Sequence, residues 1–439
     1  VLRGETEVPG IVNSALRELE RFASEELGLE SLELRVLASN SHAVDFYLRN
    51  DYHEINRIGL ANSGAGGEIN LVESTENISD HFIVMVKNLR DSRPAQGEIL
   101  TAGPSISNRE LTFVSDATMS GWNYHHSDYL NKFQDEFAEY VGAKFAIPTS
   151  SCTGALHLSL LALRIGPGDE VIMFDPSYDA YDPIVRLAGG IPIHISLKAS
   201  NGYRIDWDEL ARHITPKTKA IMVNSPHNPT GSIWDPSDLD AFAEIIKGTQ
   251  ILIVSDEVYE HIVFDGASHA SVLLHPELRK RSFVCGSFGK TFHVTGWKMG
   301  YCLAPPFLTA EFRKLHQWVT FSSATPLQYA LAEYLKDPNN YLPLSSFYQK
   351  KRDLFASFFV NSRWKVLPSH GSFFQCLDYS AITDEKDVDL ADRYTKELKV
   401  ASIPVSVFYE TPPEDKILRF CFAKDDAMLE EAGRKLAAL

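Results

Sequence analysis

The sequence contains little cysteine, only five residues in 439, and no two of them form a C-x-x-C pair. Scattered thiols in odd number do not make a disulfide framework and are typical of a reduced cytosolic protein. Apolar runs long enough for a membrane helix are also lacking, and no basic-then-apolar leader opens the sequence. We therefore expect a cytoplasmic protein with no membrane partner.

Basic residues are in the minority, 42 against 58 acidic ones, which gives a net charge of -16. A surplus of negative charge repels nucleic acids and anionic membranes, so neither is an expected partner. The 15 histidines show no H-E-x-x-H or similar paired spacing and the thiols are isolated, so no metal site is expected. A nucleophile elbow is lacking too, because the glycines in GSFG at 286–289 have the wrong spacing.

Three sections with different patterning are present, at 1–95, 100–310 and 311–439. The first has helical spacing of apolar residues at 11–27 and continues with a strand-like SLELRVLA and a helical HAVDFYL. A segment rich in Pro, Gly and Ser at 91–110 suits a linker. The last section alternates helices with shorter strands and predicts a smaller C-terminal α+β domain.

The middle section alternates apolar strand candidates with helical stretches. Seven such strands are KFAIPTS, EVIMFDP, IPIHISL, KAIMVNSP, ILIVSDE, SFVCGSF and WKMGYCLAP. Near-continuous hydrophobic runs are typical of parallel strands that are buried on both faces. The sequence therefore predicts an α/β fold with a mostly parallel seven-stranded sheet and helices on both faces.

Polar and aromatic residues follow five of these strands, at the sheet edge where ligands of open parallel sheets bind. The segments are Ser151–Gly154, Asp175–Tyr178, Asn224–Gly231, Ser255–Tyr259 and Ser287–Lys290. The first opens a helix and suits an anion, since a helix N-terminus offers free N–H groups and a favourable dipole. One ligand that touches all five segments would need an anionic group, an aromatic face and a reactive carbonyl.

Each of these signals also has an ordinary structural explanation. Lys290, at the end of an apolar strand, either extends past Gly289 to water or stays inside because its amine is reactive. SSCTG and HNPTG could be simple turns. Asp256 could cap a helix, Arg419 could belong to a salt bridge, and Tyr178 could be a core residue. The order of the segments along one sheet favours a common ligand.

Five motifs, FDPSYDAY, NSPHNPTG, SDEVYEH, SFGKTFHVTGWKMGYC and ILRFCFAK, match one family in order and spacing. From about residue 170 to 439 the chain resembles the class I pyridoxal-phosphate aminotransferases of fold type I, and it is most similar to their methionine and kynurenine transaminase branch. The resemblance implies pyridoxal 5′-phosphate as cofactor and a homodimer. It also implies methionine or an aromatic amino acid as amino donor and a 2-oxo acid as acceptor.

The resemblance further implies roles for individual residues. Lys290 would hold the cofactor as an imine and move the proton at the substrate α-carbon. The other cofactor contacts would come from the ring-nitrogen partner Asp256, the ring-hydroxyl partners Tyr259 and Asn228, the stacking ring of Tyr178, and the phosphate-binding Ser151, Cys152, Thr153, Ser287 and Lys298. The substrate contacts would come from Asn228 and from Arg419, which would bind the carboxylate as a bidentate fork.

Two parts of the chain resemble other families. Residues 103–171 resemble the start of the sugar-nucleotide aminotransferases, which use no carboxylate-binding arginine, and Gly154 stands where amino-acid transaminases usually have Glu. Tyr124 could act as the phosphate-binding tyrosine of a partner subunit. Residues 11–60 resemble the C-terminal part of a GNAT acetyltransferase, with Tyr47 on its helix. A sugar-nucleotide aminotransferase, an inactive hybrid scaffold and an acetyltransferase are therefore alternatives to an amino-acid transaminase.

Overall fold

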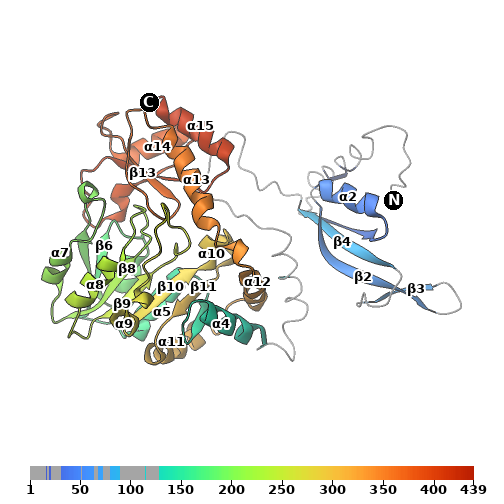
Figure 1. Ribbon diagram of the computed structural model, residues 1–439, viewed down its shortest axis with the longest axis horizontal. Coiled ribbons are helices and arrows are strands. Elements are labelled where there is room, and N and C mark those ends of the chain that lie inside the picture. The colour runs from blue at the N-terminus through green and yellow to red at the C-terminus, as the bar shows by residue number, and fades with distance from the viewer. Residues whose placement is uncertain are drawn as a thin grey trace. The chain divides into compact units, whose positions relative to one another are not determined.

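The computed structural model describes residues 31–50, 52–63, 68–72, 80–88 and 128–439, together with Leu16, Leu19, Glu20 and Val114. The chain divides into two compact units, one holding the described residues before 95 and the other those from 128 onward (Figure 1). The predicted helix at 11–27 is described only at Leu16, Leu19 and Glu20, which are helical. Tyr124 and the predicted linker at 91–110 lie outside the described residues.

The first unit is a four-stranded antiparallel sheet with helix α2. Its elements are β1 (Ser31–Leu37), α2 (Ser41–Arg49), β2 (His53–Ser63), β3 (Glu68–Val72) and β4 (Asp80–Asn88). The strand order is β1-β4-β2-β3, so β4 pairs with both β1 and β2. The unit has a small core of its own, made of Leu16, Val36, Tyr52, Ile83 and Met85. The predicted strand SLELRVLA and the predicted helix HAVDFYL are confirmed.

The second unit is built on a seven-stranded sheet in the order β5-β11-β10-β9-β8-β6-β7. Its strands are β5 (Ala146–Thr149), β6 (Glu170–Asp175), β7 (Ile191–Ser196), β8 (Thr218–Asn224), β9 (Leu252–Asp256), β10 (Ser282–Ser287) and β11 (Gly300–Leu303). Strand β11 runs antiparallel to its two neighbours, and the other pairs are parallel. All seven predicted strands and their mostly parallel arrangement are confirmed.

Helices cover both faces of this sheet, as its continuous apolar strands predict. Side chains alternate between the faces along a strand: in β6, Val171 and Met173 face a core shared with α5 and α11, whereas Ile172 and Phe174 face one shared with α4 and α8. The helices up to residue 335 are α4 (Asp128–Tyr140), α5 (Cys152–Ala162), α6 (Tyr181–Leu187), α7 (Trp207–His213), α8 (Pro236–Ile245), α9 (Pro276–Arg279), α10 (Phe288–Thr291), α11 (Pro306–Val319) and α12 (Thr325–Leu335), with 3-10 turns at Ala199–Asn201, Val272–Leu274 and Thr295–Trp297.

A smaller antiparallel sheet follows in the chain, in the order β12-β13-β15-β14. Its strands are β12 (Lys365–Val366), β13 (Phe374–Asp378), β14 (Ile403–Pro404) and β15 (Ile417–Cys421), accompanied by α13 (Leu344–Ser357), α14 (Asp387–Leu398), α15 (Asp426–Ala437) and 3-10 turns at Pro338–Asn340 and Val405–Phe408. Phe355, Trp364, Tyr394, Phe420 and Leu436 belong to the aromatic core of this part. The predicted α+β character of the C-terminal section is confirmed.

The border between the large and small parts is less sharp than the sequence pattern suggests. Phe312 of α11 and Leu331 of α12 belong to the cores on the two faces of the seven-stranded sheet, although both follow residue 311. The division at 1–95, 100–310 and 311–439 therefore stays a prediction. None of the helices in the described ranges combines the length and the apolarity that a membrane span requires.

Candidate active site

A pocket opens at the carboxyl ends of five strands of the large sheet, β5, β6, β8, β9 and β10. It is lined by Ser151, Cys152, Thr153, Tyr178, Asn224, Asn228, Asp256, Val258, Tyr259, Ser287, Lys290, Thr295 and Lys298. Every residue that the sequence assigned to a cofactor lines this pocket. The strand ends bring these residues together because parallel strands all point toward the same edge of a sheet.

Lys290 lies in the short helix α10, which begins after Ser287. The Ser287 hydroxyl accepts the N–H of Gly289 at 3.1 Å and caps the helix. The Lys290 amine lies 5.5 Å from the ring centre of Phe373 and 5.9 Å from that of Tyr259. No described residue gives it a hydrogen bond or a carboxylate partner, and burial lowers its pKa. The side chain therefore stays inside the pocket, as expected of a reactive amine.

Asp256 ends β9 with its side chain only 5% exposed. Its Oδ2 accepts the Tyr181 hydroxyl at 2.7 Å, and its Oδ1 accepts the Val258 N–H at 3.2 Å and the Cys152 thiol at 3.4 Å. Burial raises the pKa of Asp256, while these hydrogen bonds oppose the rise. The alternative of a helix cap does not apply, because a turn and no helix follows. The sequence did not single out Tyr181, although it stands three residues after Tyr178 in the same motif, FDPSYDAY.

Another part of the pocket, around the start of α5, is suited to an anion. Ser151 caps α5 and accepts the N–H of Gly154 at 3.0 Å. A Cβ on Gly300 of β11 would come within 2.6 Å of the Ser151 carbonyl carbon and 2.7 Å of the Cys152 nitrogen, so only glycine lets the strand pass this close. Lys298, which has a left-handed backbone, also lines the pocket. A helix N-terminus and a cation together favour a phosphate group.

Arg419 projects from β15 of the small sheet and meets the pocket at Asn228. Its Nη1 donates to Asn228 Oδ1 at 2.7 Å. The guanidinium carbon lies 4.1 Å from the ring centre of Phe374 and 5.2 Å from that of Phe408, so two aromatic rings hold the group in place. Burial lowers its pKa. Among the described residues Arg419 has no carboxylate partner, which removes the alternative of a salt bridge.

The segment HNPTG is a turn as well as a wall of the pocket. The Gly231 N–H donates to the His227 carbonyl at 2.8 Å, and Gly231 has a φ of 73°. The Asn228 N–H donates to Asn224 Oδ1 at 2.8 Å, which directs the Asn228 side chain toward Arg419. The two interpretations of this segment are therefore compatible.

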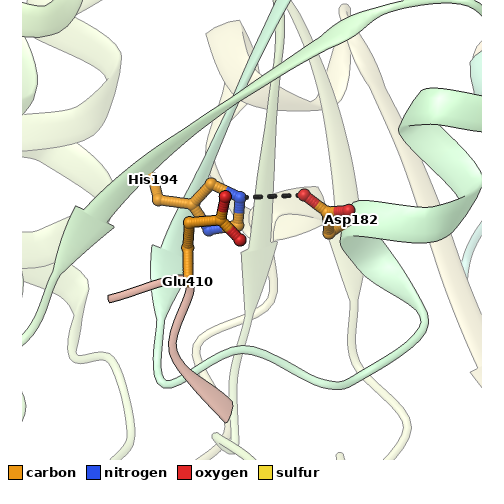
Figure 2. A group of neighbouring side chains, drawn as sticks. All are labelled: Asp182, His194 and Glu410. Atoms are coloured by element: carbon orange, nitrogen blue, oxygen red, sulfur yellow. Dashed lines mark hydrogen bonds and ion pairs between the residues drawn. The ribbon is translucent and has the colours of Figure 1, made fainter. Parts of the chain in front are cut away.

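A second group of titratable side chains is not part of the pocket lining: Asp182, His194 and Glu410 approach one another (Figure 2). His194 is in contact with a carboxylate through both ring nitrogens: Nδ1 is 3.0 Å from Asp175 Oδ1 and Nε2 is 3.1 Å from Asp182 Oδ2. The hydrogen bond with Asp175 is the main cause of a raised pKa of His194. Arg186 pairs with Asp182 and lies 3.8 Å from Glu410. This geometry describes an ion-pair network, because no ring nitrogen is left to bind a metal.

A larger cleft of about 600 Å³ lies between Ile233–Asp240 and Ala267–Pro276. Its walls are mostly apolar, and no lysine, arginine or cysteine lines it. The smaller pocket at the strand ends holds the reactive side chains, so the candidate active site is placed there.

Much of the chain is similar to known proteins. The family model "Aminotransferase class I and II" matches residues 104–436. The chain belongs to this family. It is 45% identical over 292 residues to a methionine aminotransferase of Escherichia coli K12, covering 66% of this chain and 75% of that protein. It is 36% identical over 308 residues to kynurenine–oxoglutarate transaminase 3 of Rattus norvegicus, covering 64% and 68%.

Solved structures show the same relationship. An Escherichia coli protein described as having a methionine aminotransferase function superposes with a TM-score of 0.73 at 38% identity, over 78% of this chain and 94% of that one. N-succinyldiaminopimelate aminotransferase of Mycobacterium tuberculosis gives a TM-score of 0.71 at 28% identity, over 78% and 93%. The predicted aminotransferase fold and family are thereby confirmed. The sugar-nucleotide resemblance of 103–171 and the acetyltransferase resemblance of 11–60 stay predictions.

Proposed function

We propose that this protein is a pyridoxal-phosphate-dependent amino-acid aminotransferase that takes its amino group from methionine or an aromatic amino acid and gives it to a 2-oxo acid. The observation that carries the proposal is that Lys290, inside the pocket, and Arg419, which contacts the pocket residue Asn228, have no carboxylate partner among the described residues. Lys290 faces the buried Asp256 end, and Arg419 is held 2.7 Å from Asn228 between two phenyl rings. A reactive amine and a carboxylate-binding fork are what an amino-acid transaminase needs.

The residues present fit pyridoxal 5′-phosphate. The N-terminus of α5, Ser287 and Lys298 would hold the phosphate, and Asp256 would pair with the ring nitrogen. Tyr259 and Asn228 would hydrogen-bond the ring hydroxyl, with Tyr178 against the ring face. When bound, the cofactor supplies an aldehyde that carries the amino group and a ring that accepts electrons from the substrate α-carbon.

The side chains divide the remaining work. The Lys290 amine, whose pKa burial lowers, would take the proton from the substrate α-carbon and deliver it two bonds away, to the carbon of the cofactor aldehyde group. Asp256 would keep a proton on the ring nitrogen through its ionised carboxylate. Arg419 would grip the substrate carboxylate with two parallel N–H donors, which fixes the α-carbon in front of Lys290.

The surroundings of Arg419 favour an amino acid with a large apolar side chain. Phe374 and Phe408 flank the guanidinium, and Phe373 lies next to Lys290. A sugar nucleotide has no carboxylate for Arg419 and would face these rings with hydroxyl groups. The names of the related enzymes, methionine aminotransferase and kynurenine–oxoglutarate transaminase, support the same class of donor.

The test is reduction of the purified, cofactor-loaded protein with borohydride, followed by peptide mapping. The pyridoxyl group is expected on Lys290, and Lys290→Ala should lose both the label and methionine-dependent transamination. Lys298→Ala is the matched control: it should keep the label on Lys290 while binding the cofactor more weakly. A label on Lys298, or full activity in Lys290→Ala, would overturn the proposal.

A further inference from the structure

Tyr181 is the buried partner of the carboxylate at the centre of the site. It is the first residue of α6 and only 3% exposed. Its hydroxyl donates to Asp256 Oδ2 at 2.7 Å, the shortest of the hydrogen bonds that the Asp256 carboxylate receives from described residues. The bond joins α6 to the end of β9 across 75 residues of sequence.

The two oxygens of Asp256 have different partners. Oδ1 accepts a backbone N–H and a thiol, at 3.2 and 3.4 Å, whereas Oδ2 relies on Tyr181. Burial and the charge of Asp256 raise the pKa of the Tyr181 hydroxyl, so this group stays protonated and donates its hydrogen to the carboxylate. A buried carboxylate that keeps its charge needs such donors, because desolvation otherwise favours the neutral acid.

The ring of Tyr181 holds a second element of the site. It contacts the ring of Tyr178 edge-on, with centres 5.7 Å apart and planes at 78°. One residue thus touches both the carboxylate assigned to the ring nitrogen and the ring assigned to stack on the cofactor.

We propose that Tyr181 is a positioning residue that holds the Asp256 carboxylate, ionised and correctly rotated, against the ring nitrogen of pyridoxal phosphate. The proposal rests on the proposed function. Without the hydroxyl, Oδ2 has no donor among the described side chains, and the carboxylate can turn about its remaining Oδ1 contacts. Loss of the Tyr181 hydroxyl acts through Asp256. It should therefore weaken the binding of the cofactor ring nitrogen and leave the binding of the phosphate and the aldehyde unchanged.

The experiment compares two ligands of the cofactor-free protein, pyridoxal 5′-phosphate and its deaza analogue, in which C–H replaces the ring nitrogen. Dissociation constants are measured by quenching of protein fluorescence. Tyr181→Phe should weaken pyridoxal phosphate about tenfold, the effect of one hydrogen bond to a charged group, and leave the analogue unchanged. The affinity ratio of the two ligands therefore falls about tenfold. A merely structural role would weaken both ligands equally and leave this ratio as it is.

Tyr203→Phe is the matched control. Tyr203 is 5% exposed, and its hydroxyl has no hydrogen-bond partner among the described residues, so its removal should change neither affinity. An unchanged ratio in Tyr181→Phe overturns the positioning role. If the wild-type protein binds no pyridoxal phosphate, the proposed function itself is wrong. Failure of the proposed function can therefore be told apart from failure of the positioning role. If Tyr181→Phe does not fold, the double variant Tyr181→Phe with Asp256→Asn, which removes both partners of the hydrogen bond, is compared with Asp256→Asn alone. A double variant that folds supports the hydrogen bond. A double variant that does not fold overturns the proposal.

Discussion

At the scale of the residue, Arg419 distinguishes the candidate substrates. Arg419→Lys replaces a planar fork with a point charge and should remove one hydrogen bond to the substrate carboxylate. Such a bond to a charged group contributes about 1.5–3 kcal/mol, so kcat/KM for methionine should fall roughly 10–100-fold. Steady-state kinetics with methionine and with an amino sugar nucleotide measure the effect.

The control is Arg393→Lys, a salt-bridged arginine of α14 whose side chain is 39% exposed and pairs with Glu385. Exposed ion pairs contribute little, so this change should leave kcat/KM unaltered. Equal activity of Arg419→Lys and the wild type on methionine, or a preference for the sugar nucleotide, would contradict the role of Arg419.

Short motifs made most of the pocket predictable, since each pocket residue follows a recognisable strand. Tyr181 and the aromatic pair around Arg419 were not predictable in the same way. The Tyr181 bond spans from α6 to β9, and Phe374, which contacts Arg419 of β15, belongs to a different strand, β13. Contacts of this kind depend on how distant elements pack, and no local pattern encodes them.

At the scale of the element, the His194 network joins β6, β7 and α6 to the segment that carries Phe408. Asp175 of β6 accepts both His194 Nδ1 and the Glu410 N–H, at 3.0 and 2.9 Å. The Ser177 N–H donates to the Phe408 carbonyl at 2.8 Å. The network therefore holds a ring that contacts Arg419 against the strand end that carries Tyr178.

His194→Gln should destabilise the protein in a pH-dependent way. Because the pKa of His194 is raised in the folded protein, the stability that His194 contributes is complete below its pKa in the unfolded chain, about 6.5. That stability is lost as the pH rises through the pKa of the folded protein. We expect a loss of roughly 1–2 kcal/mol near pH 6 that shrinks at higher pH. Asp182, whose pKa is lowered chiefly by Arg186 and also by His194, acts in the opposite sense and loses its contribution only in acid.

Thermal unfolding of the wild type and the variant between pH 5.5 and about 9 measures this difference. His370→Gln, with a side chain that is 53% exposed, serves as control and should show little change. A stability difference that grows with rising pH would contradict the assignment.

The strands were predictable and their pairing was only partly so. Continuous apolar runs marked all seven strands of the large sheet, because both faces are buried. The same runs carry no signal for direction, and the antiparallel β11 was not anticipated. Strands β12 and β14 have two residues each, too few for any periodicity.

At the scale of the whole molecule, one end of α11 exposes large apolar side chains. Trp318 is 82% exposed, Val319 65% and Phe321 75%. We propose that this patch contributes to the homodimer that the family resemblance implies, since clustered apolar exposure marks an interface. Trp318→Glu with Phe321→Ser should then favour the monomer, weakening association roughly a hundredfold or more.

Size-exclusion chromatography with light scattering measures the molecular mass. Leu187→Ser is the control, because Leu187 is 73% exposed on α6 and lies outside the patch. A double variant that keeps the wild-type mass at micromolar concentration would assign the interface elsewhere.

The acetyltransferase resemblance of residues 11–60 stays a prediction, and the described turn between β1 and α2 differs from the turn that acetyl-CoA binding requires. A pyrophosphate site of that kind uses a glycine-rich turn before the helix, whose N–H groups face the ligand. The turn between β1 and α2 contains no glycine. The Asn40 side chain already accepts the Ala43 N–H at 3.1 Å, which occupies one of the donors at this helix end.

A chain shortened to residues 96–439 should therefore keep its transaminase activity, because every described residue of the pocket follows residue 150. The expected kcat/KM for methionine is within about twofold of the full chain, since distant and independent parts of a protein contribute additively. The full chain should show no binding of acetyl-CoA by calorimetry, because the described turn between β1 and α2 contains no glycine. Size-exclusion chromatography of the shortened chain shows whether the N-terminal unit also keeps the protein soluble or contributes to its oligomeric state. Tight binding of acetyl-CoA by the full chain would contradict the expected absence of binding. Transaminase activity that is lost on removal of residues 1–95 and restored when that segment is added back would show that the N-terminal unit has a direct role in catalysis.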